Sequence, residues 1–155
     1  MELSLEQRIE RVEANSEIQN IMGKYSHWLT AHKYSQCLGL FALNTPGVKV
    51  EMMWGAYEGK EGLKRCYLGF HEKTSREEYR GVMAMHNLTT PVIEVADDLQ
   101  TAKAVWVCPG HETLRTPEGL KAHWAWMKYG SDFIKEEGKW KIWPYACVWY
   151  FSNSF

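Results

Sequence analysis

The sequence of 155 residues has no long apolar run, no closely spaced cysteine pair and no excess of one charge. A membrane span needs a run of ~20 apolar residues, so no transmembrane helix is expected. The 18 Lys and Arg residues against 19 Asp and Glu leave a net charge of -1, which offers no basic surface for nucleic acid or an anionic membrane. We therefore predict a protein that binds neither nucleic acid nor membrane.

Several motifs that would indicate a cofactor are also missing. The four cysteines, Cys37, Cys66, Cys108 and Cys147, are far apart and form no C-x-x-C pair, so neither a zinc site nor a disulfide framework is indicated. A glycine-rich phosphate loop, a G-x-S-x-G elbow and an H-E-x-x-H helix are absent as well. We expect no metal and no organic cofactor. The opening MELSLEQRIERVE is acidic where a signal peptide would be basic and then apolar, so we expect a cytoplasmic protein.

Aromatic residues are abundant, with 8 Trp, 8 Tyr and 5 Phe. The hydrophobic content of 45% suits one compact domain over residues 1–155 with a substantial core. So many aromatic rings exceed what a core of this size needs, which indicates an aromatic-lined cavity or an aromatic interface.

The first half of the chain has helical periodicity. Ser4 and Gln7 form a capping-box pattern, and apolar residues then recur at helical spacing as far as Leu29, which predicts a long amphipathic helix. A short second helix is expected to start at a Ser35 cap. Residues 48–59 are expected to form a strand, residues 59–74 a third helix, and residues 74–81 a loop.

From residue 83 onward the periodicity changes to two. Four runs rich in β-branched and aromatic residues cover 86–95, 101–114, 120–136 and 139–151, with short turns between them. Short connections imply antiparallel neighbours. The fold class predicted is α+β, with three N-terminal helices packed on a strongly curved, mostly antiparallel sheet.

The order and spacing of four segments, IERVEANSEIQNIMGKYSHWL, GAYEGKEGLKRCY, HNLTTPVIEV and EEGKWKI, resemble the SnoaL-like branch of the nuclear transport factor two superfamily. The likeness covers nearly the whole chain. It implies a cone-like (cystatin-like) fold with a deep pocket. The superfamily includes scytalone dehydratase, ketosteroid isomerase and polyketide cyclases as well as ligand binders, so the fold alone does not decide the function.

The resemblance also implies site residues. Tyr25 and His86 match positions used by members with dehydratase or cyclase activity, and Tyr129 matches a pocket-facing polar residue of the penultimate strand. Many relatives carry an aspartate five residues after the tyrosine, where this chain has Thr30, so a carboxylate that would activate a base is not found there. The second pocket histidine of scytalone dehydratase would fall near Val105 or Trp106, whereas the nearest histidine, His111, lies further along the chain.

These residues predict a small acid–base site. A histidine exchanges protons near neutral pH, and a tyrosine in an apolar pocket can polarise a carbonyl. We expect His86, Tyr25 and Tyr129 to be catalytic. The expected ligand-binding residues are Trp28, Trp54, Trp106, His111, His123, Met127 and Ser131.

Structural roles remain open for the same residues. His86 could be an ordinary polar residue at a strand start, and Tyr25 could belong to the core. His111 and Glu112 could be a base with its orienting carboxylate, or a loop at the mouth of the pocket. His27, His32 and His71 fall on helical faces expected to be solvated and receive no role.

Two functional classes are therefore retained, with a third possibility beside them. The first is a lyase or isomerase that acts on a cyclic or aromatic small molecule, and the second is a non-catalytic binder of a similar hydrophobic ligand. A structural dimer module with an unused pocket is a third possibility. Trp124 and Trp126 alternate with the inward set of their strand and would expose a large apolar patch, which predicts a homodimer through the outer face of the sheet.

Overall fold

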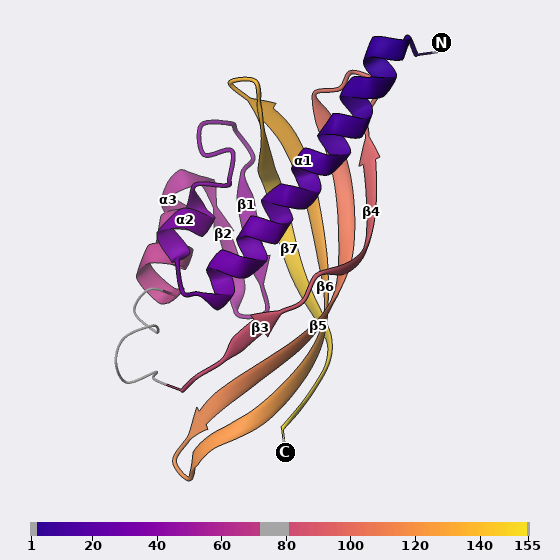
Figure 1. Cartoon of the computed structure of the whole chain (residues 1–155). Coiled ribbons are helices and arrows are strands. Elements are labelled where there is room, and N and C mark those ends of the chain that lie inside the picture. Colours follow the sequence, from indigo (N-terminus) through magenta and orange to yellow (C-terminus); the bar gives the residue numbers. More distant parts are fainter. Residues whose placement is uncertain (1–2, 72–80, 155) are drawn as a thin grey trace.

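The computed structural model describes residues 3–71 and 81–154 as helices on one side of a seven-stranded sheet (Figure 1). The helices are α1 (Leu5–Thr30), α2 (Tyr34–Leu38), α3 (Gly59–Lys64) and the π-helix η1 (Arg65–His71). The strands are β1 (Lys49–Met52), β2 (Gly55–Glu58), β3 (Ala84–His86), β4 (Thr89–Val95), β5 (Thr101–Thr116), β6 (Gly119–Glu136) and β7 (Lys139–Ser154). The predicted α+β fold class is confirmed.

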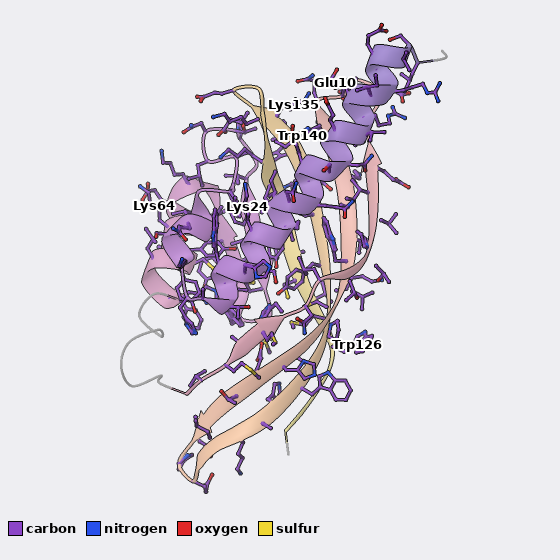
Figure 2. All side chains as sticks on the ribbon, viewed as in Figure 1. Glu10, Lys24, Lys64, Trp126, Lys135 and Trp140 are labelled. Atoms are coloured by element: carbon purple, nitrogen blue, oxygen red, sulfur yellow. The ribbon has the colours of Figure 1, made fainter. Side chains whose placement is uncertain are left out.

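Helix α1 forms as predicted, because its first turn is capped and one face is apolar. The Ser4 hydroxyl accepts from the Gln7 backbone, and the Gln7 side chain accepts from the Ser4 backbone. Five residues of α1 are buried: Ala14, Ile18, Met22, Tyr25 and Leu29. The helix lies diagonally across the sheet (Figure 1), and a 2.7 Å ion pair between Glu10 and Lys135 fixes its first half to β6 (Figure 2).

The shorter elements differ from the prediction at three places. Helix α2 begins at Tyr34 after an N-cap at Lys33, so Ser35 does not cap it. The strand expected over residues 48–59 is a hairpin of β1 and β2, which turns at residues 53–54 ahead of Gly55, whose φ is 149°. The run expected over residues 86–95 is divided into β3 and β4 by an interruption at residues 87–88.

The third helix also differs from the prediction. It is α-helical only as far as Lys64 and continues as a π-helix to His71. The end of this expected helix and most of the expected loop over residues 74–81 lie outside the described residues.

The sheet has the strand order β2-β1-β7-β6-β5-β3, with β4 also paired to β5. Every pair is antiparallel except β1 with β7. Alternation along β6 is unbroken, as predicted, because His123, Ala125, Met127, Tyr129, Ser131 and Phe133 are all buried. The helices cover this inner face, and the core lies between the two layers. No helix in the described part of the chain is long and apolar enough to cross a membrane.

Candidate active site

A pocket of about 440 Å³ opens between the inner face of the sheet and the ends of α1, α2 and η1. Most of its wall is apolar, from residues such as Leu29, Met52 and Phe70. Glu112 is the one carboxylate that lines it among the described residues, and no lysine or arginine of that part of the chain does so. The polar groups of the wall are therefore mainly imidazoles and phenols.

His86 stands at the centre of a hydrogen-bonded group in this wall. Its Nε2 lies 3.1 Å from Glu112 Oε1, and the two side chains are only 12% and 13% exposed. Its Nδ1 is hydrogen-bonded to the hydroxyl of Tyr129. The Ser26 hydroxyl donates to the His86 backbone carbonyl, which attaches β3 to α1. Both ring nitrogens of His86 are thus engaged.

Strand register explains why these side chains meet. In the β3–β5 ladder His86 pairs with Gly110 and Ala84 pairs with Glu112, so His86 and Glu112 are diagonal neighbours on one face. Gly110 lies between them on that face without a side chain. A Cβ there would lie 2.5 Å from Met127 Cε, so a larger residue at position 110 would displace the end of the Met127 side chain.

The hydrogen-bond partners of His86 indicate which of its ring nitrogens carries the proton. A carboxylate can only accept a hydrogen bond, so Nε2 donates to Glu112 and Nδ1 accepts from the Tyr129 hydroxyl. Burial raises the pKa of Tyr129 well above its ordinary value, so the phenol keeps the proton that it donates. This arrangement leaves Nδ1 as the basic nitrogen of the imidazole.

A layer of buried tyrosines lies under this group. The hydroxyls of Tyr25 and Tyr67 are 2.9 Å apart, and the rings of Tyr25 and Tyr145 are separated by 5.2 Å. Burial raises the pKa of each of these three phenols well above the ordinary value. At neutral pH they are uncharged hydrogen-bond donors. Of the three, Tyr25 lines the pocket.

The pocket thus brings together the three expected catalytic residues, His86, Tyr25 and Tyr129. Of the expected ligand-binding residues, Trp54 and His123 line it as well.

The other expected ligand-binding residues lie elsewhere. Trp28 packs against the core, Met127 is buried within it, and Trp106 packs edge-on against Phe133. Ser131 donates to the Pro144 carbonyl. His111 points to the outer face, where it stacks on Trp124 with 5.8 Å between ring centroids.

Glu112, His32 and His71 are among the lining residues that were not assigned to the site from the sequence. Glu112 supplies from β5 the carboxylate that is missing at Thr30. Simple alternation along β5, which puts Cys108, Gly110 and Glu112 on one face, was the signal that could have found it. His32 and His71 also line the pocket, although their helical faces were expected to be solvated.

Metal ligation requires several donors in one place. Among residues 3–71 and 81–154, no three His, Cys, Asp or Glu side chains come together as a candidate metal site. All four cysteines are buried, as expected for small apolar residues.

Comparison with known proteins gives a family match and many structural matches. The family model of the SnoaL-like domain matches residues 10–145. No curated protein matches the sequence significantly.

The solved structures that resemble this chain share its fold at low identity. A hexachlorocyclohexane dehydrochlorinase from Novosphingobium barchaimii is 13% identical with a TM-score of 0.75, over 96% of this chain and 94% of that one. A candidate scytalone dehydratase from Novosphingobium aromaticivorans is 16% identical with a TM-score of 0.73, over 96% and 91%. A nuclear transport factor two-like protein with a cystatin-like fold, from the same species, is 12% identical with a TM-score of 0.71, over 94% and 87%.

Proposed function

The chain belongs to the SnoaL-like domain family, and from this premise we propose that it is a cofactor-independent acid–base enzyme of the dehydratase, isomerase or cyclase type. Its substrate is a cyclic or aromatic small molecule. The observation that carries the proposal is the 3.1 Å contact between His86 and Glu112 in the wall of a largely apolar pocket. Two structural relatives are named as a dehydrochlorinase and a candidate dehydratase, and both names describe eliminations.

The geometry supports a simple proton transfer. A substrate carbonyl takes the hydrogen bond of the Tyr129 hydroxyl, which frees Nδ1 of His86. Nδ1 then removes a proton from the neighbouring carbon, and Glu112 stabilises the imidazolium that forms. The electron pair of the broken C–H bond forms a C=C bond to the carbonyl carbon, and the C=O π pair moves onto the oxygen that is hydrogen-bonded to Tyr129. When a β-hydroxyl leaves, this pair re-forms the C=O bond and the C=C bond shifts to the α and β carbons. In a dehydration, the C–O bond to the leaving hydroxyl breaks and His86 returns the proton to that oxygen, so that water is released.

A non-catalytic binder is the second candidate, and the mouth of the pocket favours it. Met53 is 61% exposed, and Trp54 and Phe70 are 44% and 45% exposed beside the opening. The rings of Trp54 and Phe70 lie 5.3 Å apart. Such an apolar rim would hold a hydrophobic ligand without any chemistry.

Proton abstraction can be tested without knowing the natural substrate. We expect the wild-type protein to accelerate hydrogen–deuterium exchange at the carbons next to the carbonyl of 2-tetralone in D₂O, measured by NMR. His86→Asn, which cannot act as a base, should lower the rate by ~10²- to 10⁴-fold, as expected for loss of positioned acid–base catalysis. Glu112→Gln keeps a hydrogen-bonding side chain but loses the charge, and should lower the rate by a smaller factor.

His111→Asn is the matched control, since it makes the same substitution on the outer face of the sheet. It should keep the wild-type rate. Full exchange activity in His86→Asn would disprove the role of His86 as base. Tetralone binding without any acceleration by the wild-type protein would favour the binder.

We also propose that the protein is a homodimer that pairs through its outer sheet face, as expected from the sequence. Trp124 and Trp126 are each 43% exposed there, and Figure 2 shows Trp126 on the side of the sheet away from α2 and α3. Lys103 and Asp132 are register partners on the strands that bear this face, so the face carries both signs of charge and does not repel a second copy of itself. The cytoplasmic location stays a prediction from the sequence.

A further inference from the structure

His71 occupies a part of the pocket wall that the proposed reaction does not use. It is the last residue of η1, and π-helices are rare and frequently occur at functional sites. Its imidazole stacks on Tyr34 at 5.0 Å and on Tyr67 at 5.7 Å. The rings of Trp54 and Phe70 approach it edge-on at 5.6 Å and 5.5 Å. Four aromatic rings therefore hold one polar ring in a fixed orientation.

Burial, together with the nearby His86 and His32, lowers the pKa of His71 to about 4. The imidazole is thus neutral at pH 7. A neutral imidazole carries one donor and one acceptor, and this combination suits a hydroxyl or carbonyl oxygen better than an ion. His71 and His86 both line this cavity.

His32 and Tyr34 extend this polar region of the wall. The Tyr34 hydroxyl is 3.0 Å from His32 Nδ1, and both residues line the pocket. His32 has a φ of 56° at the end of α1, where Lys33 donates to the Trp28 carbonyl. Glycine is preferred at this position of a helix end. The backbone conformation at position 32 would favour glycine, which has no side chain, yet the chain has a histidine there.

From these contacts we propose that His71, His32 and Tyr34 form a second polar subsite, which binds a second oxygen of a neutral, planar substrate. The inference rests on the proposed function, which places the first oxygen at Tyr129 and His86. No lysine or arginine among the described residues lines the pocket, so that part of the chain offers a carboxylate or phosphate group no cationic partner there. The substrate class is an uncharged cyclic or aromatic compound with two oxygen functions, one near each end.

Binding of unreactive probes tests this subsite separately from the chemistry. The probes are 2-naphthol, with one hydroxyl, and 2,6- and 2,7-dihydroxynaphthalene, with two. We expect the wild-type protein to bind the better diol about 3- to 10-fold more tightly than 2-naphthol by calorimetry, as one additional neutral hydrogen bond provides. His71→Phe keeps an aromatic ring in the stack but removes both nitrogens. It should reduce that preference to about 1-fold.

His27→Phe makes the same substitution on an exposed position of α1 and should keep the preference. His32→Asn, which tolerates the left-handed backbone, should lower the preference in part, and it serves as the test if His71→Phe does not fold. An unchanged preference in the folded subsite variant would overturn the subsite. Equal affinity of the wild-type protein for all three probes, or no binding of any, would overturn it as well.

The two proposals fail in different ways. A preserved diol preference without tetralone exchange would reject the enzymatic function but keep the subsite as part of a binder. Exchange that depends on His86, together with no diol preference, would reject the subsite alone. His86→Asn should weaken 2-naphthol and the diols alike and so leave their ratio unchanged.

Discussion

Burial of His71 couples the stability of the folded protein to pH. Its pKa falls from 6.5 to about 4 because burial disfavours the charged form. The unfolded chain therefore binds more protons than the folded one between these two values. The stabilising contribution is complete above pH ~6.5 and is lost as the pH falls toward ~4, by on the order of 3 kcal/mol at ~1.4 kcal/mol per unit.

The measurement is urea unfolding of the wild-type protein and His71→Phe at several pH values between 4.5 and 7. Phenylalanine does not titrate, so the free energy of unfolding of the variant should decrease less on acidification than that of the wild type. His27→Phe should follow the wild-type curve, because His27 is exposed. Parallel curves for the wild type and His71→Phe would show that His71 takes up its proton equally in both states.

The sequence predicted the residues that line the pocket because of their own place on a helix or strand. It did not predict Glu112, whose role depends on contact with a residue of another strand. His86, Tyr25 and Tyr129 were placed in the pocket by periodicity and by family resemblance. Glu112 was weighed only as a partner of the adjacent His111. Its contact with His86 depends on the register of β3 against β5, and a sequence does not state that register.

Among the elements, the turn between β6 and β7 has an unfavourable residue. Glu137 and Gly138 connect the paired residues Glu136 and Lys139 with φ values of 53° and 73°. A two-residue turn with both φ values positive is of type I′, for which Asn-Gly is strongly preferred. We expect Glu137→Asn to raise the free energy of unfolding by about 0.5–1 kcal/mol, because asparagine tolerates the left-handed backbone better.

Denaturant unfolding of Glu137→Asn and of a matched variant, Glu118→Asn, checks this expectation. Glu118 lies in the turn between β5 and β6 but has no positive φ, and its carboxylate accepts from the Thr116 hydroxyl. Its replacement should give no gain in stability. Equal effects at the two positions would mean that the backbone of the β6–β7 turn is not the cause.

The long helices and strands could be predicted from the periodicity of the sequence, whereas the short ones could not. Helix α1 and strands β5, β6 and β7 extend over enough residues for the apolar pattern to repeat several times. The β1–β2 hairpin, the interruption between β3 and β4 and the change from α3 to η1 each involve only a few residues. At that length, local backbone conformation and packing decide the structure. Of these short elements, the π-helix contributes most to the site, because it carries both Tyr67 and His71.

In the whole molecule, the two faces of the sheet have different roles. The inner face and the helices enclose the pocket, while the outer face presents tryptophan side chains to solvent. The high aromatic content predicted either a lined cavity or an interface. Many of the rings are buried in the core, and others lie at the pocket or on the outer face. Trp54 lies at the pocket, and Trp124 and Trp126 lie on the opposite side of β6 from Tyr129.

The proposed homodimer makes the last prediction. Light scattering after size-exclusion chromatography should give twice the 18.1 kDa chain mass at micromolar concentration. A double variant, Trp124→Lys with Trp126→Lys, should be monomeric, because burying two ammonium groups against the partner's copies costs several kcal/mol. Val12→Lys, at a 69% exposed apolar position on α1, should remain dimeric. A monomeric wild type would disprove the homodimer. A dimeric double variant would show that the interface does not include Trp124 and Trp126. Because these tryptophans lie across the sheet from the pocket, the double variant should still exchange the protons of 2-tetralone.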